Sequence, residues 1–174
     1  EMLEIFHESE IDIKMKKASV LRRMRDIESG LDIINELLEQ YPKNYDLLNY
    51  KVYWLQYLNR KKEALKLIQE LVDEAPYNGT YHDTYGELLM YNEDYEKAIE
   101  KFLKAIEIVG DDWFINQTYI KLGICYKELK QFDLAFESLK KGKSLTNESI
   151  ADSETKQKWL TIADLFLTEI KKFL

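Results

Sequence analysis

Apolar residues recur along this chain at steps of three and four, with polar residues between them. The first such stripe consists of Ile11, Met15, Ala18, Leu21, Met24 and Ile27. A three- and four-residue step is the period of an α-helix with one buried face. The pattern therefore predicts a helix over about residues 11–28. We expect the acidic stretch of residues 1–12 to form a short amphipathic turn that packs on this helix.

A second stripe follows Gly30, a residue that we expect to let the chain turn. It consists of Leu31, Ile34, Leu37, Leu38 and Tyr41. Pro42 comes next, and proline cannot continue a helix because it lacks the amide hydrogen and clashes with the preceding turn. The first two stripes therefore predict a helical hairpin.

The helix ends repeat at a fixed interval. Pro42 and Pro76 each close an apolar helix and lie 34 positions apart. Ala64 precedes Pro76 by twelve positions, and Ala98 and Ala135 recur in the same context, each followed four residues later by a large apolar residue. A period of this length indicates an array of similar helical hairpins.

The interval between the last two alanines is longer than the others. Ala98 and Ala135 are separated by 37 positions, so about three extra residues fall in the stretch 110–116. Gly110 is expected to stop the third hairpin. Asp111 or Asp112 is expected to cap the helix that follows.

The most regular stretch is residues 119–139, which combines Leu122-Gly123, Tyr126 and Ala135. The small residues are expected where the two helices of a hairpin approach most closely, with larger apolar residues around them. This combination resembles the pattern of the tetratricopeptide repeat (TPR) family. Residues 78–110 repeat the pattern, with Tyr85-Gly86, Leu89, Tyr95, Ala98, Phe102 and Ala105.

The resemblance implies an all-α fold, a right-handed α-α superhelix of about four hairpins followed by a C-terminal capping helix. We expect one TPR-like domain over residues 1–174. Its expected units cover about 11–43, 44–77, 78–110 and 113–147, and the last helix covers about 149–173. In the unit 44–77, Lys51 and Val52 replace the expected Leu-Gly, so the helical phase of that unit stays open.

The C-terminal helix carries one broad apolar face. The residues of that face are Trp159, Ala163, Phe166, Ile170 and Phe173. Solenoids need terminal helices that cover the last repeat, so a capping role is expected. The alternative is that the same face docks a second copy of the chain or another domain.

Composition and charge narrow the classes of function. The 174 residues include 25 Lys and Arg against 32 Asp and Glu, which gives a formal net charge of −7. An acidic balance disfavours broad contact with nucleic-acid phosphate. No run of eighteen apolar residues exists, so no membrane span is expected and a cytoplasmic protein is predicted. Glu1 precedes Met2, which leaves open whether the chain is a piece of a longer protein.

Groups suited to catalysis or metal binding are scarce. Cys125 is the single cysteine and lies among apolar residues, so we expect it to be buried. His82 occupies a packing position of its repeat, and His7 lies far from it in sequence. No phosphate-binding glycine loop, nucleophile elbow or His-Glu-x-x-His helix occurs. The sequence therefore predicts no enzyme, no cofactor and no metal site.

One basic cluster stands out in this acidic chain. It consists of Lys14, Lys16, Lys17, Arg22, Arg23 and Arg25. The simplest interpretation is a solvated helix exterior, and the alternatives are a site for an acidic peptide or for RNA. The segment has no interleaved aromatic residues, which disfavours a grip on single-stranded RNA by stacking.

The resemblance also implies where a partner would bind. In TPR proteins the first helix of each hairpin lines the inner surface, and many of the twelve tyrosines fall near such helices. The implied peptide-binding residues are Asn49, Tyr53, Tyr57, Asp83, Glu87, Met90, Tyr91, Ile120, Ile124 and Lys127. A groove of tyrosine, methionine, isoleucine and carboxylate side chains suits an extended or helical peptide.

The expected function is that of a non-catalytic scaffold that binds a peptide or protein segment in this concave groove. Two alternatives stay open. One is a helical-repeat nucleic-acid binder that uses the basic cluster. The other is a regulatory or oligomerisation domain of a longer protein, with self-association through the C-terminal helix.

Overall fold

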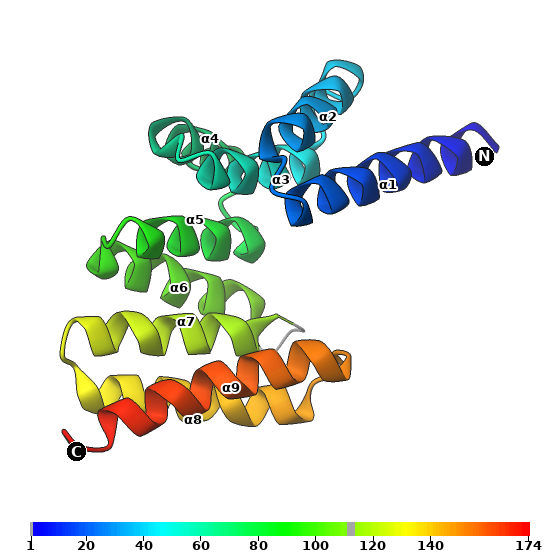
Figure 1. Ribbon diagram of the computed structural model, residues 1–174. Coiled ribbons are helices and arrows are strands. Elements are labelled where there is room, and N and C mark those ends of the chain that lie inside the picture. The colour runs from blue at the N-terminus through cyan, green and yellow to red at the C-terminus, as the bar shows by residue number, and fades with distance from the viewer. Residues whose placement is uncertain (1, 111–113) are drawn as a thin grey trace. The chain divides into compact units, whose positions relative to one another are not determined.

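A computed structural model describes residues 2–110 and 114–174, and it describes side chains from Glu10 onward (Figure 1). These residues form nine α-helices and no strand. The helices are α1 (Met2–Arg23), α2 (Ile27–Gln40), α3 (Tyr45–Tyr57), α4 (Lys61–Glu74), α5 (Gly79–Tyr91), α6 (Tyr95–Val109), α7 (Ile115–Glu128), α8 (Phe132–Glu148) and α9 (Ser153–Ile170). The expectation of an all-α fold with four hairpins and a C-terminal helix is confirmed.

The helices group into two compact units, one ending at Glu74 and the other beginning at Ala75. In the first unit, α1 pairs with α2 and α3 pairs with α4, while α2 contacts α3. The fully buried side chains of this unit include Ile34, Leu37, Leu47, Val52 and Ile68. The expectation of a single domain over the whole chain stays a prediction.

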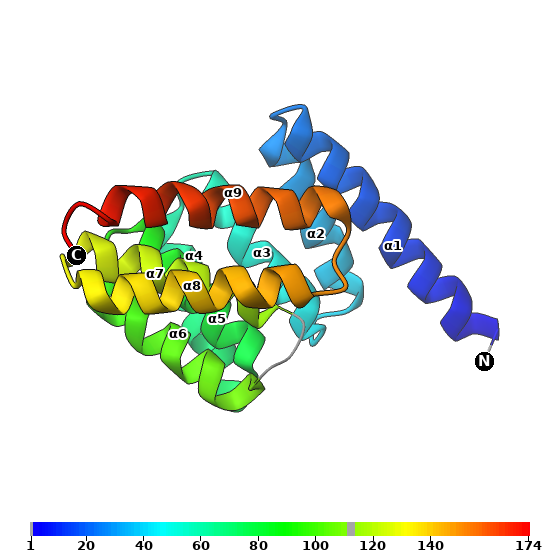
Figure 2. The same ribbon diagram turned by 90° about the horizontal axis from the view of Figure 1, so that it is seen from below.

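The second unit contains α5 to α9. Each helix from α5 to α8 contacts the next one along the chain, and α5 also touches α7. The last helix, α9, runs beside both α8 and α7 (Figure 2). One buried cluster joins Ile120 of α7 to Leu139 of α8 and to Ala163 and Ile170 of α9. The apolar face of α9 is therefore used within its own unit, as a capping helix requires.

All four hairpins turn in the same way, at a residue with left-handed backbone dihedrals. These residues are Arg25, Asn59, Glu93 and Lys130, with φ between 57° and 64°. In each case the next amide donates to the carbonyl five positions earlier, as Asp94 does to Leu89 at 3.0 Å. This is the Schellman arrangement that ends a helix. The turns lie 34, 34 and 37 positions apart, which are the intervals that the sequence predicted.

Small residues mark the close contacts between helices. A Cβ atom added to Gly86 would lie 2.7 Å from the Phe102 ring, and one added to Gly123 would lie 2.6 Å from Cγ of Leu139. Ala98 and Ala135 are completely buried. The predicted role of these small side chains is confirmed.

A further close contact was not predicted. A Cβ atom on Gly142 of α8 would lie 2.9 Å from the carbonyl oxygen of Asn116 and 3.0 Å from the amide nitrogen of Ile120, both on α7. Gly142 follows Ala135 by seven positions, as Ala105 follows Ala98. This shared spacing of small residues could have identified Gly142 as a close-contact position from the sequence.

The start of the chain differs from expectation. Helix α1 begins at Met2 and ends at Arg23, so residues 2–10 are helical rather than a separate turn. No glycine or proline interrupts this stretch, and acidic residues near a helix N-terminus are favourable. The chain turns at Arg25 and not at Gly30, which lies buried inside α2 against Trp54. The absence of a side chain at Gly30 therefore lets α2 pack closely against Trp54 of α3.

The end of the third hairpin agrees with expectation. Gly110 caps α6 with a φ of 66°. Asp111 and Asp112, expected as caps of the next helix, lie outside the described residues.

Candidate peptide-binding surface

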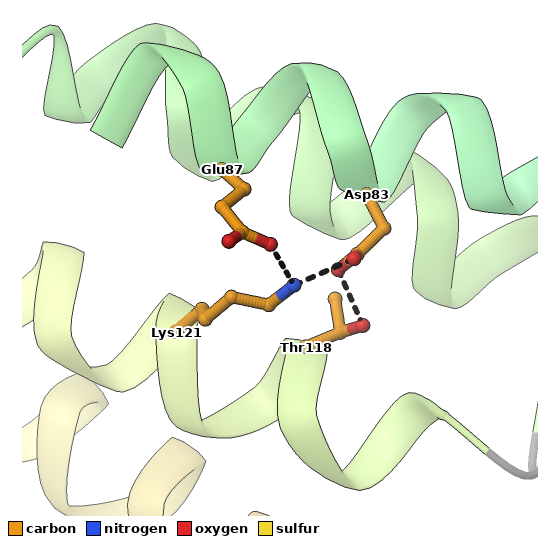
Figure 3. Close-up of polar contacts among 4 residues, drawn as sticks. All are labelled: Asp83, Glu87, Thr118 and Lys121. Atoms are coloured by element: carbon orange, nitrogen blue, oxygen red, sulfur yellow. Dashed lines mark hydrogen bonds and ion pairs between the residues drawn. The ribbon is translucent and has the colours of Figure 1, made fainter. Parts of the chain in front are cut away.

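A polar cluster links α5 to α7 in the second unit (Figure 3). The Lys121 ammonium donates to Oδ2 of Asp83 at 2.6 Å and to Oε2 of Glu87 at 3.1 Å. The Thr118 hydroxyl donates to the other carboxylate oxygen of Asp83 at 2.7 Å. These contacts join residues that are 34 to 38 positions apart in sequence. The two helices are thereby held in one register.

Local helix geometry explains why the four side chains converge. Asp83 and Glu87 are four positions apart on α5, and Thr118 and Lys121 are three positions apart on α7, so each pair shares a helix face. The start of α5 is fixed by Asn78, whose side-chain oxygen accepts from the Thr80 amide at 3.0 Å. Nζ of Lys121 also lies 5.4 Å from the centre of the Phe102 ring.

The cluster is largely removed from water, and its charges do not cancel. Two carboxylates face one ammonium group, which gives a formal charge of −1. The side chain of Lys121 is only 5% exposed, whereas that of Glu87 is 22% exposed. A buried lysine needs such partners, because a charge left unpaired in the interior costs several kcal/mol. Glu87 is the member that solvent reaches most easily.

Two more of the expected residues continue this face of α5. Met90 and Tyr91 follow Glu87 by three and four positions, so they lie one helical turn further on. Met90 is half-buried and Tyr91 is exposed. The α5 surface, defined here as Asp83, Glu87, Met90 and Tyr91, thus combines two held carboxylates, of which that of Asp83 is buried, with the half-buried Met90 and the exposed Tyr91.

The expected residues of α7 are covered by α9. Ile120 is completely buried, and Ile124 packs on the same apolar cluster. Lys127 pairs with Glu169 of α9 at 2.9 Å and with Glu128 at 3.0 Å, and its ammonium lies 5.0 Å from the Phe166 ring centre. Burial lowers the pKa of Lys127, but the hydrogen bonds to Glu169 and Glu128 outweigh it and raise the pKa overall. These three side chains are therefore engaged within the unit.

The expected residues of α3 lie in the first unit. Asn49, Tyr53 and Tyr57 are spaced by four positions and share one helix face. Asn49 and Tyr53 are half-buried, and Tyr57 is exposed. Arg22 of α1 donates to the Tyr57 hydroxyl at 3.2 Å and lies 5.5 Å from its ring centre. The neighbouring Val52, Trp54 and Leu55 are buried, which settles the helical phase that the sequence left open.

Thr118 and Lys121 were not among the predicted site residues. Both are buried, and Lys121 lies between the expected groove residue Ile120 and the expected packing residue Leu122. A lysine among the packing residues of a helix is itself a signal, because lysine is rarely buried without a partner. The sequence did not show which carboxylate would be that partner.

The remaining reactive groups are held in the interior. His82 is buried, and its Nε2 lies 2.9 Å from the Pro76 carbonyl oxygen. Cys125 is buried too, and desolvation, with a smaller contribution from Glu128, raises its pKa to about 12. The buried positions predicted for both residues are confirmed.

Neither a metal site nor a membrane span is visible in the described part of the chain. No cluster of three or more His, Cys, Asp or Glu side chains that could hold a metal ion occurs among the described residues. None of the described helices is long and apolar enough to span a bilayer.

Two comparisons with known protein sequences give a match, one to a family model and one to a curated relative. Residues 90–166 match the family model described as "RMD1-3: Regulator of microtubule dynamics protein 1-3", and this match covers less than half of the chain. The chain is also 27% identical over 128 residues to "Response regulator aspartate phosphatase I" of Bacillus subtilis (strain 168). That alignment covers 70% of this chain and 32% of the relative. The chain thus spans about a third of the relative's length.

Solved structures resemble most of the chain. TTC0263, a TPR protein of Thermus thermophilus, has a TM-score of 0.71 at 16% identity, covering 88% of this chain and 81% of that one. MamA from Desulfovibrio magneticus RS-1 has a TM-score of 0.63 at 15% identity, covering 92% and 93%. The Arabidopsis OM64 TPR domain has a TM-score of 0.62 at 14% identity, covering 75% and 96%. Together with the four hairpins and their period, these likenesses show that the chain has the tetratricopeptide-repeat fold.

Proposed function

We propose that this chain is a non-catalytic scaffold and that the α5 surface binds an extended or helical segment of a partner protein. The observation that carries the proposal is the Glu87 carboxylate, held by Lys121 at 3.1 Å on the same helix face as the half-buried Met90 and the exposed Tyr91. The carboxylate can accept hydrogen bonds from the partner. Tyrosine and methionine supply the adaptable apolar contacts that protein interfaces favour.

The polar cluster supports this role because it fixes the carboxylate before a partner arrives. Freezing a free glutamate side chain on binding costs about 0.5–1.5 kcal/mol in lost rotamer freedom. The Lys121 contact has already restricted Glu87, so less of that cost falls on association. The cluster also retains one formal negative charge, which favours a partner segment with a lysine, an arginine or amide donors near this point.

The other predicted binding residues have a less direct part in the proposal. Ile120, Ile124 and Lys127 support α9: Ile120 is completely buried, Ile124 packs on the same apolar cluster, and the Lys127 ammonium is paired with Glu169. Asn49, Tyr53 and Tyr57 form a separate face on α3 in the first unit, and we propose them as a second contact. The apolar face of α9 packs within its own unit, which favours capping over self-association.

The Bacillus relative supports a role in binding proteins. Its printed name describes a protein that acts on a response regulator, and hence on another protein. The chain spans only about a third of that relative, so we confine the proposal to binding and do not extend it to the phosphatase activity.

The proposal is tested with a partner captured from native lysate by cross-linking, identified by mass spectrometry, and then purified for calorimetry. We expect the double variant Glu87→Gln/Tyr91→Ala to weaken binding at least tenfold, as loss of an interface hot spot does. The matched control is Glu96→Gln/Tyr77→Ala, which makes the same changes at exposed positions of the same unit. Equal affinities of the double variant and the wild type would overturn the site.

A further inference from the structure

The side of α1 that faces away from α2 carries large apolar side chains in solvent. Ile13, Val20 and Met24 are 63%, 52% and 72% exposed. Ala18, by contrast, is completely buried, and α1 contacts α2. The helix therefore has a packed face and an opposite face without a covering element among the described residues.

The three apolar residues form one continuous stripe. They follow one another at steps of seven and four positions, which keeps them on one side of the helix. Met24 lies just beyond the assigned helix, but its amide still donates to the Val20 carbonyl at 3.0 Å, so the stripe stays in register. It extends over three turns, or about 16 Å.

Basic side chains lie within this stripe and along one of its edges. Lys17 lies four positions after Ile13 and falls within it, while Lys16 and Arg23 fall along one edge, and all three are exposed. Arg22 belongs to the opposite side, where it contacts Tyr57. Lys14 is already paired with Glu10 at 3.2 Å. Asp12 is exposed on the same part of α1, but Lys16, Lys17 and Arg23 outnumber it, so the face is positive in a chain whose formal net charge is −7.

We infer that the stripe of Ile13, Val20 and Met24, with Lys16, Lys17 and Arg23, binds an acidic amphipathic helix of a partner protein. Three turns of alternating apolar and basic side chains match a helix that presents leucine-like residues on one side and carboxylates beside them. Charge complementarity selects the acidic partner, and the apolar stripe supplies the area to be buried.

Two other occupants fit the same face less well. RNA offers phosphates to the lysines but leaves the apolar stripe without an apolar partner, and Ile13, Val20 and Met24 include no aromatic side chain for stacking. Among the described side chains of α1, an anionic membrane would receive three large apolar ones, and it would face a chain of net negative charge. An acidic amphipathic helix, by contrast, can pair with the basic side chains and also cover the apolar stripe.

The inference is tested on the full chain with a synthetic helical peptide that has leucine at positions i, i+3, i+4 and i+7 and glutamate elsewhere. Fluorescence anisotropy measures its binding alongside a scrambled peptide, a lysine-for-glutamate peptide, poly(U) RNA and vesicles of phosphatidylserine and phosphatidylcholine. We expect binding to the acidic helix alone, weakening as salt rises because exposed charges are screened.

Two double variants separate the charged from the apolar contribution. Lys16→Glu/Lys17→Glu and Val20→Gln/Met24→Gln should each weaken binding at least tenfold, with helix content unchanged by circular dichroism. The matched control is Lys61→Glu/Lys62→Glu, which reverses two adjacent exposed lysines on α4. Glu87→Gln/Tyr91→Ala should bind the acidic helix normally, which keeps this inference separate from the α5 surface.

Several results would overturn the inference. They are failure to bind the acidic helix, equal binding of the scrambled peptide, or a loss in the α4 control as large as in the α1 variants. Binding of poly(U) or of vesicles in place of the helix would assign the face to those ligands. Concentration-dependent dimerisation in light scattering that Val20→Gln/Met24→Gln abolishes would assign it to a second copy of the chain.

Discussion

At the scale of single residues, Lys121 holds the polar interior of the second unit together. It is almost fully buried between two carboxylates and a phenylalanine ring, and no single neutral side chain can replace all of these contacts. The same residue fixes Glu87, the carboxylate that we propose for partner binding. Stability and binding are consequently coupled at this position.

Replacing Lys121 by Met should lower the free energy of unfolding by about 3 kcal/mol, because removing one member of a buried ion pair leaves the other charges uncompensated. Urea denaturation measures this change. The matched control is Lys104→Met, which removes a surface lysine paired with Glu107 at 2.9 Å and should change stability by less than about 1 kcal/mol. A loss no larger than that of the control would show that the cluster adds little to stability.

Some of these residue contacts could be predicted from the sequence, and others could not. The small residues at Gly86, Ala98, Gly123 and Ala135 repeat with the helices, so their role in packing was predictable. The pairing of Lys121 with Asp83 was not, because a lone lysine in a helix does not identify a partner 38 positions away. The turn at Arg25 was missed since arginine carries no preference for left-handed backbone.

At the scale of the elements, the contact between α7 and α8 depends on the absence of a side chain at Gly142. The nearest atoms to an added Cβ are backbone atoms of Asn116 and the backbone and side chain of Ile120. A backbone cannot rotate away as a flexible side chain can. The helices would have to separate to admit even one methyl group.

Gly142→Ala should therefore destabilise the chain by about 1–3 kcal/mol, as overpacking of an interior does. Helix propensity alone would give the opposite sign, because alanine is favoured over glycine by about 1 kcal/mol inside a helix. Thermal unfolding followed by circular dichroism decides between the two. The exposed neighbour Ser144→Ala is the control, and a rise in melting temperature for Gly142→Ala would contradict the packing argument.

The position of α9 was harder to predict than its existence. Its apolar stripe indicated a helix that packs on another element, and capping was the expected use. The stripe did not reveal that Ile120, Ile124 and Lys127, taken as groove residues, would lie under it. Amphipathic patterns define which face is buried, but not which neighbour buries it.

At the scale of the whole molecule, the helices differ in how many neighbours support them. Helix α7 contacts α5, α6, α8 and α9, whereas α1 contacts α2. Helices with many packed neighbours open only with their unit, while those with few open locally. Helix α1, at one end of this range, carries the stripe proposed for an acidic helix, whereas α7, at the other end, supplies the Lys121 that holds Glu87 of the α5 surface.

Native-state hydrogen exchange should consequently be slowest in α7 and fastest in α1. The expected order follows from packing, because the amides of α1 can open without breaking the core of the unit. Mass spectrometry of deuterated peptic fragments measures it, and the intermediate helix α3 serves as an internal reference. Protection in α1 equal to that in α7 would contradict this account.

The four hairpin turns have a practical consequence. Arg25, Asn59, Glu93 and Lys130 have exposed side chains at equivalent corners of successive repeats. The native thiol, Cys125, is buried with a pKa of about 12, so near neutral pH it stays protonated and reacts slowly. Cysteines introduced at these corners would be the sites that take up spin labels or dyes. Distances between such labels, one per repeat, would then report how the chain moves when a ligand binds.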